Sequence, residues 1–326
     1  MPVNSQLGIK AETTWGTAVT VDRFYEFNSE SINLETGRIE SPSMRSTGRV
    51  QRSDRSVPYV KGAAGNIELD VLTKNMGLLL KHSFGTVDTS SAVDSCYTHT
   101  FWPVDLYGLG LTAQINRALH PAGTDQAFTW AGVKIVGGSF EIEKEGHLKM
   151  MVDIVSRSET TGTALASASY ATGTVELFTW AGAALTVNGT ALKVEDFKVE
   201  WSNGLNTDRY KLASSTARQE PTANGFAEIT GNFTADFENL TRYNHFNATT
   251  AGSNVGTVEL TCTAPTLAGT ATYPSFKVTL PAFRFDEAPV NVGDMEGLTV
   301  AYAGKALFDG TSQAMTVTYV TTDATP

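Results

Sequence analysis

Three glutamates at alternate positions are the residues in this sequence that could most simply perform acid–base chemistry. Glu141, Glu143 and Glu145 lie in the string FEIEKEG, and alternate residues of a β-strand share one face. Two carboxylates on one face could act as the acid and base of glycoside hydrolysis. Three acids at alternate positions are explained more simply by a strand that faces solvent or a lumen, so we expect no enzyme activity.

Other catalytic and metal-binding signatures are missing from the sequence. The five histidines form no HExxH pair. No Gly-x-Ser-x-Gly elbow, P-loop or GxGxxG follows a predicted strand. Cys96 and Cys262 lack metal-ligand spacing and are expected to be buried free thiols. The sequence therefore predicts neither a metal ion nor a cofactor.

An aromatic cluster offers a different kind of site. The string CYTHTFWP brings together Tyr97, Phe101 and Trp102, whose rings could form a platform for a sugar. On this interpretation the protein is a carbohydrate-binding β-sandwich module of a phage or cell surface and remains monomeric at every concentration. Packing of the rings in a core or an interface explains the same residues.

Alternation of apolar and polar residues with a period of two dominates the chain and predicts mainly antiparallel β-structure. Clear examples lie at 67–71, 197–201 and 276–280. Clusters of Gly, Ser, Thr and Asn separate the predicted strands. Two segments, VLTKNMGLLLKHSFG and FENLTRYNHFN, have helical spacing instead.

The surroundings of these two helices predict an internal duplication. GNIELD precedes the first and GNFTAD the second, so that Gly65, Asn66 and Asp70 match Gly231, Asn232 and Asp236 at one common offset. The strings SINLETG and KVEWSNG end at Gly37 and Gly204, which have nearly the same separation. A repeated FTWAG, at 128–132 and 178–182, has dissimilar flanks and is interpreted as a local echo. We expect two tandem antiparallel β-sandwich or partial-barrel domains, each with one short α-helix. They comprise residues 1–165, with an N-terminal arm and an insertion at about 85–127, and residues 166–326.

A long basic loop is predicted between Gly37 and Gly65. In a chain of net charge −10, it carries Arg38, Arg45, Arg49, Arg52, Arg55 and Lys61. The corresponding interval of the second half carries Arg209, Lys211 and Arg218. Such a loop could simply be a solvated surface. A basic loop on an acidic body also suits docking onto another copy, and head-to-tail docking builds rings or filaments.

Charge and hydropathy narrow the setting. No apolar run is long enough to span a bilayer, and the N-terminal string MPVNSQLGIKAETTWGT lacks the pattern of a signal peptide. We therefore expect synthesis in a cytoplasm and no membrane association. The acidic balance disfavours general affinity for nucleic acid because phosphate is repelled. It suits a surface past which nucleic acid slides.

The order of several motifs resembles the tail tube (major tail) proteins of long, flexible-tailed bacteriophages. GIKAETTWGT at 8–17 resembles the opening motif of that family. The strand ESINLE, the long Arg-containing loop, GNIELD and the Leu-rich helix then follow in the same order as in the family. Near the end of the chain, VTLPAFRF at 278–285 and EGLTVAYAGKALFD resemble the closing strands.

This resemblance implies a structural virion protein with tail-tube-type domains and no enzyme activity. Its rings would surround a β-barrel channel and stack head to tail into the tube through which DNA leaves the capsid without specific binding. Relatives with two tube domains per chain form threefold rings with pseudo-sixfold symmetry, so the duplication favours a homotrimer and leaves a homohexamer open. The basic loop would contact the neighbouring ring, and the three glutamates would face the lumen.

Further partners and a location also come from the resemblance. They are the tail tip or baseplate, the tape measure and the tail terminator proteins. The protein would be made in the cytoplasm of the bacterial host and would end in the virion tail.

Overall fold

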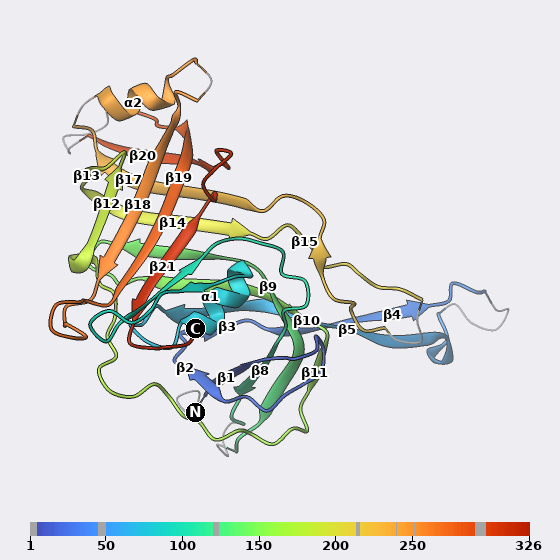
Figure 1. Ribbon diagram of the computed structural model, residues 1–326. Coiled ribbons are helices and arrows are strands. Elements are labelled where there is room, and N and C mark those ends of the chain that lie inside the picture. The colour runs from blue at the N-terminus through green and yellow to red at the C-terminus, as the bar shows by residue number, and fades with distance from the viewer. Residues whose placement is uncertain are drawn as a thin grey trace.

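Antiparallel strands make up most of the computed structural model (Figure 1). It describes residues 5–44, 50–119, 124–212, 216–238, 240–250, 252–290 and 298–326. The prediction of a mainly β fold with two short α-helices is confirmed in these residues, where the helices are α1 (Gly77–Phe84) and α2 (Leu240–Phe246). Within the described residues, one sheet of 19 strands runs through both halves of the chain, and a second sheet pairs two short strands.

The strands of the first half follow one another in a fixed order of hydrogen-bonded neighbours, β4–β5–β10–β9–β8–β1–β2. Strand β11 pairs with β9 beside β10, and β3 pairs with the end of β5. The bounds are β1 (Leu7–Ala11), β2 (Arg23–Tyr25), β3 (Ser29–Glu30), β4 (Asn33–Glu40), β5 (Ser56–Asp70), β6 (Asp88–Thr89), β7 (Tyr97–Phe101), β8 (Leu111–Asn116), β9 (Ala127–Glu143), β10 (Lys149–Ser156) and β11 (Ser158–Thr160).

The second half repeats that order as β14–β17–β20–β19–β18–β12–β13, with β21 paired to β19 as β11 is to β9. Helix α2 follows β17 as α1 follows β5. The bounds are β12 (Ala183–Val187), β13 (Thr190–Leu192), β14 (Val194–Ser202), β15 (Leu205–Asn206), β16 (Thr222–Ala223), β17 (Glu228–Asp236), β18 (Val255–Thr263), β19 (Ser275–Glu287), β20 (Thr299–Ala306) and β21 (Thr316–Thr321).

Two β-bulges recur at equivalent places in the halves. In the first half, residues 131–132 of β9 lie opposite Thr112 alone, and in the second half residues 281–282 of β19 lie opposite Thr257 alone. A second bulge skips Val136 in β9 and Asp286 in β19. The sequence separation between the halves is the same for both bulges. The last three residues of the second FTWAG copy form a short 3-10 turn, Trp180–Gly182, whereas the first copy lies within β9, so the repeated string takes two different structures.

The two halves are joined by hydrogen bonds between β9 and β14. Residues 137–143 of β9 pair with residues 196–202 of β14, so the sheet of the first half continues into the second without a break. The domain boundary between residues 165 and 166 stays a prediction, because the strands on either side of it belong to one sheet.

The interval expected as an insertion, 85–127, contains two different things. Strand β8 pairs with β1 and β9 as β18 pairs with β12 and β19, so it has a counterpart in the second half. The β6–β7 hairpin has no counterpart in the pairing order of the described residues. Its strand β7 pairs with β21, which extends the sheet of the second half.

The N-terminal motif holds the first bulge of β9 in place. Glu12 is buried, and its carboxylate accepts hydrogen bonds from the Gly132 amide at 2.8 Å, the Thr112 hydroxyl at 2.9 Å and the Gly16 amide at 2.6 Å. Gly132 has a φ of +64°, a conformation that favours glycine. Its bulged amide therefore finds an acceptor that the strand ladder cannot provide.

We predict that Glu12→Ala lowers the free energy of unfolding by about 3 kcal/mol, because the buried Gly132 amide and the half-buried Gly16 amide lose their acceptor. Glu26→Ala, which removes an exposed carboxylate from the same arm, should change it by less than about 0.5 kcal/mol. Chemical denaturation followed by circular dichroism measures both. Equal midpoints for the two variants would contradict the anchoring role of Glu12.

Candidate assembly surfaces

The predicted basic loop at 38–61 is wrong at its two ends, because residues 38–40 and 56–61 are paired strands of a β-hairpin. Strand β4 pairs with β5 from Asn33↔Ala64 to Glu40↔Ser56, and Figure 1 shows the hairpin extending well away from the body of the protein. A hairpin that projects into solvent buries neither face, so its sequence lacks the apolar alternation that marks the other strands. It also carries exposed large apolar side chains, namely Leu34, Ile39, Val57 and Val60.

Basic residues of this hairpin gather toward its tip. Arg38, Arg52 and Arg55 are exposed, whereas Arg45 and Arg49 lie outside the described residues. Arg52 donates two hydrogen bonds to the carboxylate of Asp54, at 2.7 and 2.6 Å, and this pairing lowers the pKa of Asp54. Arg55 lies 3.8 Å from the same carboxylate. With Arg38 and Glu40 included, the described part of the tip has three arginines and two acids, so its basic excess is small.

The corresponding basic segment of the second half folds back instead of projecting. It runs along the base of the hairpin, where the Thr216 hydroxyl donates to the Val60 carbonyl at 2.9 Å and the Arg218 amide donates to the Lys61 carbonyl at 3.2 Å. The Lys61 ammonium lies 5.0 Å from the centre of the Tyr210 ring. Lys61 thus belongs to a contact within the chain.

Arg218 fastens this segment to the hairpin base. Only 3 % of it is exposed. Its guanidinium donates to the carbonyls of Thr207 at 2.9 Å, Ser156 at 2.9 Å and Ala63 at 3.3 Å, and it pairs with the Glu35 carboxylate. Most of its donors are therefore satisfied inside one chain, an arrangement the sequence does not reveal.

The other two basic residues of the segment differ from Arg218. Arg209 donates to the Glu220 carbonyl, while Lys211 is exposed. Their predicted role between rings stays a prediction.

A polar sheet face contains two of the three predicted acids. Glu141 and Glu143 project from β9 on the face opposite the buried Phe140 and Ile142. Glu145 does not share that face. It follows the end of β9 in a turn, at a φ of +64°, so the expectation of three acids on one strand face is wrong for Glu145. The strand ends too early because the chain reverses there into β10.

The same polar face continues across neighbouring strands. One cross-strand row runs through Asp70, Lys149, Glu141, Lys198 and Asn232. Acidic and basic residues alternate along most of this row. Residues of opposite charge that lie directly across from each other on neighbouring strands stabilise the sheet.

Interactions on this face also change the pKa of its groups. The Lys198 ammonium lies 2.7 Å from the Glu200 carboxylate. The hydrogen bond between them and the nearby charges of Glu200 and Glu141 raise the pKa of Lys198. Burial and the charge of Glu200 raise the pKa of Asp153. The face therefore holds fixed charges that pair laterally with one another.

A junction that the sequence analysis missed lies beneath this face. Trp201 of β14 is 4 % exposed and packs between Phe140 of β9 and Phe84 of α1, with ring centres 4.8 and 5.1 Å away. A residue of the second half thus fills the space between a helix and a strand of the first half. When SINLETG and KVEWSNG are aligned at their final glycines, Leu34 corresponds to Trp201, and this match of two apolar residues could have indicated the contact.

The structure also bears on the other chemical candidates. Phe101 is fully buried, so it cannot form an exposed sugar platform with Tyr97 and Trp102. Cys96 and Cys262 are buried free thiols, as predicted. Among the described residues, no group of three or more His, Cys, Asp or Glu side chains could hold a metal ion. Neither described helix has the length and hydropathy to cross a bilayer.

We predict that Arg218→Ala lowers the free energy of unfolding by about 2–3 kcal/mol, because buried carbonyls lose their donor. The loss is smaller than for a fully buried ion pair, since Glu35 remains partly in water. Lys211→Ala is the matched control and should be nearly neutral. Limited proteolysis should also cut segment 203–227 faster in Arg218→Ala alone. Equal cleavage rates in both variants would show that other contacts hold the segment.

Comparison with known proteins agrees with the motif order. A family described as phage tail tube protein matches residues 2–325, nearly the whole chain. No curated protein matches the sequence. With the family matched from the N-terminal arm to the closing strands, this chain belongs to the phage tail tube protein family.

Proposed function

We propose that three copies of this chain close into a ring of six similar units, and that the rings stack into the tube through which phage DNA leaves the capsid. The observation that carries the proposal is the repeated order of strand pairing, with the two bulges of β9 recurring at a common offset in β19. Because each chain supplies two of the six units, the ring contains three chains and has threefold symmetry.

The β9–β14 contact supports this arrangement because it joins one unit to the next within a single chain. A sheet that continues from unit to unit leaves an edge at each end of the chain, and a closed ring removes both edges. Edges that would be a liability in a monomer are therefore expected of a ring subunit.

The polar face of β9 and β14 is the proposed lumen wall, with Glu141 and Glu143 on it. Acidic side chains repel DNA phosphate. The lysines on this face are paired with neighbouring glutamates, so they are not free to bind phosphate. DNA would pass along such a wall without being held. We propose a structural role without catalysis or cofactor.

The proposed partners are further copies of the chain and the other tail proteins, namely the tail tip or baseplate, the tape measure and the tail terminator. The proposed location is the virion tail, after synthesis in the host cytoplasm. A sugar-binding module is not favoured, since its proposed aromatic platform includes the buried Phe101.

We predict that concentrated protein forms rings and tubes by electron microscopy, and that native mass spectrometry gives a ring of three times the 34.9 kDa chain mass. Six chains per ring would overturn the threefold assignment and retain the tube. Compact monomers at every concentration and salt condition would overturn the tube as well.

We also predict that replacing Arg45, Arg49, Arg52 and Arg55 by Ser shortens tubes and leaves single rings intact. Exposed ion pairs contribute about 0–1 kcal/mol each, but a ring presents several hairpins, so their sum affects stacking. Salt should shorten wild-type tubes for the same reason.

The control for the hairpin variant is Lys144→Ser with Lys193→Ser, which removes exposed basic residues from elsewhere on the chain. Tube lengths are measured in micrographs at low salt. Unchanged lengths in the quadruple variant would mean that stacking depends on apolar contacts.

A further inference from the structure

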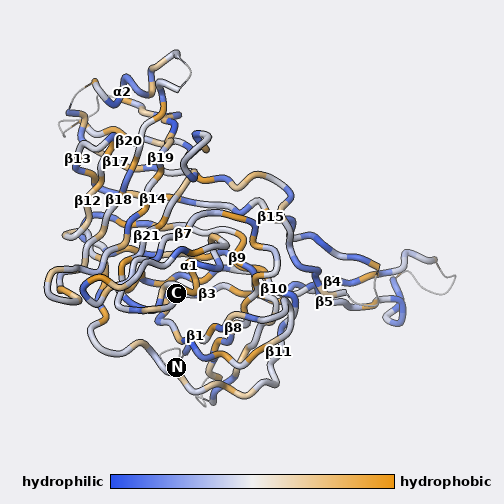
Figure 2. The backbone as a smooth tube through the Cα atoms, in the orientation of Figure 1, coloured by the Kyte–Doolittle hydropathy of each residue, from blue (hydrophilic) through white to orange (hydrophobic). Residues whose placement is uncertain are grey.

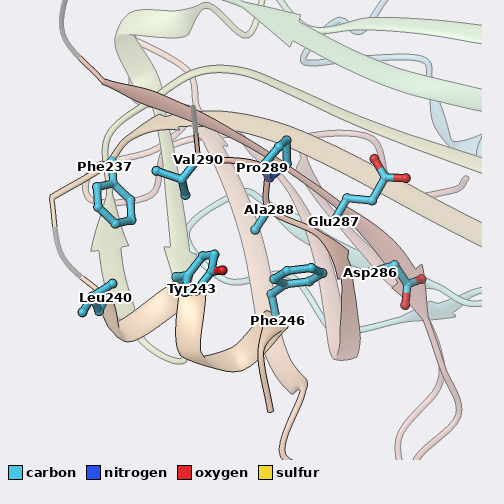
Figure 3. A pocket seen from close by; sticks show the side chains of 9 residues that line it. All are labelled: Phe237, Leu240, Tyr243, Phe246, Asp286, Glu287, Ala288, Pro289 and Val290. Carbon is cyan, nitrogen blue, oxygen red and sulfur yellow. The ribbon is translucent and has the colours of Figure 1, made fainter. Parts of the chain in front are cut away.

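An apolar groove lies at the open end of the sheet, between α2 and the end of β19. Its volume is about 460 Å³. Figure 3 shows Leu240, Tyr243 and Phe246 of the helix facing Pro289 and Val290, which follow β19. Leu240 is 58 % exposed, so apolar surface faces solvent here in the single chain.

The equivalent groove in the first half is filled. The common offset of the two bulges relates residues 287–290 to residues 137–140 of β9. Those residues of β9 pair with β14, which inserts Trp201 against Phe84 at the end of α1. Helix α2 likewise ends in an aromatic residue, Phe246, and that residue lines the open groove.

The described part of the chain contains one strand segment in the position equivalent to β14. Trp201 lies opposite Ile229 of β17, and Leu34 lies opposite Ala63 of β5. Ile229 and Ala63 have the same sequence separation as the matched glycines that precede the two helices. Leu34 is therefore the counterpart of Trp201, and it is 40 % exposed where Trp201 is buried.

The edge of β4 has its backbone groups oriented for pairing at Leu34. The Ile32 carbonyl accepts a hydrogen bond from Arg117 at 2.7 Å, while the Ser31 amide donates to Asn66 of β5. Alternate residues of a strand direct their N–H and carbonyl groups to the same side. Leu34, two residues after Ile32, thus directs its groups away from β5, toward a strand that would add there.

We infer that the β4 edge of a second copy pairs with residues 287–290, at the end of β19, and places its Leu34 in the α2 groove, opposite Ala288. This inference rests on the proposed ring and specifies its junction between chains. In the register of β9 with β14, Asn33 of the second copy lies opposite Pro289 and Glu35 lies opposite Glu287.

The chemistry of this register is compatible with the residues present. Pro289 has no N–H, but the alternation that points Leu34 and Ala288 at each other points the backbone nitrogen of Pro289 away from the new strand. Glu35 is already paired with Arg218, which compensates its approach to Glu287. The apolar groove meanwhile receives an apolar side chain.

Engineered disulfides test the register. Asn33 and Pro289 would be a pair without mutual hydrogen bonds, the kind with the closest side chains, so Asn33→Cys with Pro289→Cys should give covalent trimers under oxidising conditions. Asn33→Cys with Glu287→Cys is the control, because diagonal residues are too far apart for a disulfide. It should cross-link at least tenfold more slowly. The native cysteines are buried and add little background.

Substitution of Leu34 tests the groove independently of Pro289. Leu34→Asp should abolish rings while circular dichroism and monomer size stay unchanged, and Leu34→Trp, which copies Trp201, should retain rings. Rings with neither cross-linking nor sensitivity to Leu34→Asp would overturn this junction and leave the proposed tube standing. Absence of rings in the wild-type protein would overturn both.

Discussion

The hydrogen bonds between β9 and β14 are the interaction on which the arrangement of the molecule depends. They carry one sheet across the two halves, and they place Trp201 of the second half beneath Phe84 and Phe140 of the first. Without them each half would have an unpaired edge and an exposed apolar groove. The fold therefore has, inside one chain, the kind of contact that sheet proteins otherwise make between chains.

Equivalent positions of the two halves carry different residues where one half makes a contact inside the chain and the other half leaves the same surface exposed. Trp201 is buried in its groove, whereas its counterpart Leu34 is partly exposed on a hairpin that leaves the body. The two basic segments have diverged in the same way. One extends as the β4–β5 hairpin, and the other is fastened along its base by Arg218. Figure 2 shows hydrophilic residues along parts of both segments.

How far the sequence predicts the structure depends on whether a segment buries one face. Strands such as β14 and β17 bury alternate residues, so their alternation and the matching of Gly65 with Gly231 predict the fold and its repetition. The β4–β5 hairpin buries neither face toward its tip, and its sequence pattern is therefore that of a loop. The candidate site is predictable only in part, for related reasons. Glu141 and Glu143 follow from strand periodicity, but the turn that holds Glu145 depends on where β9 ends. The burial of Arg218 depends on contacts with distant parts of the sequence, of which local patterns contain no record.

The pairing of β7 with β21 has a consequence for how the chain reaches this structure. Val317 pairs with Phe101, and the Tyr319 hydroxyl donates to the Leu72 carbonyl, a contact that spans 247 residues. Contacts between such distant residues slow folding, because a long stretch of disordered chain must be confined before they form. During translation, β7 can pair with β21 only after the chain has been synthesised as far as Thr321. The contacts of β7 with β21 can therefore form only after the strands of both halves have been synthesised.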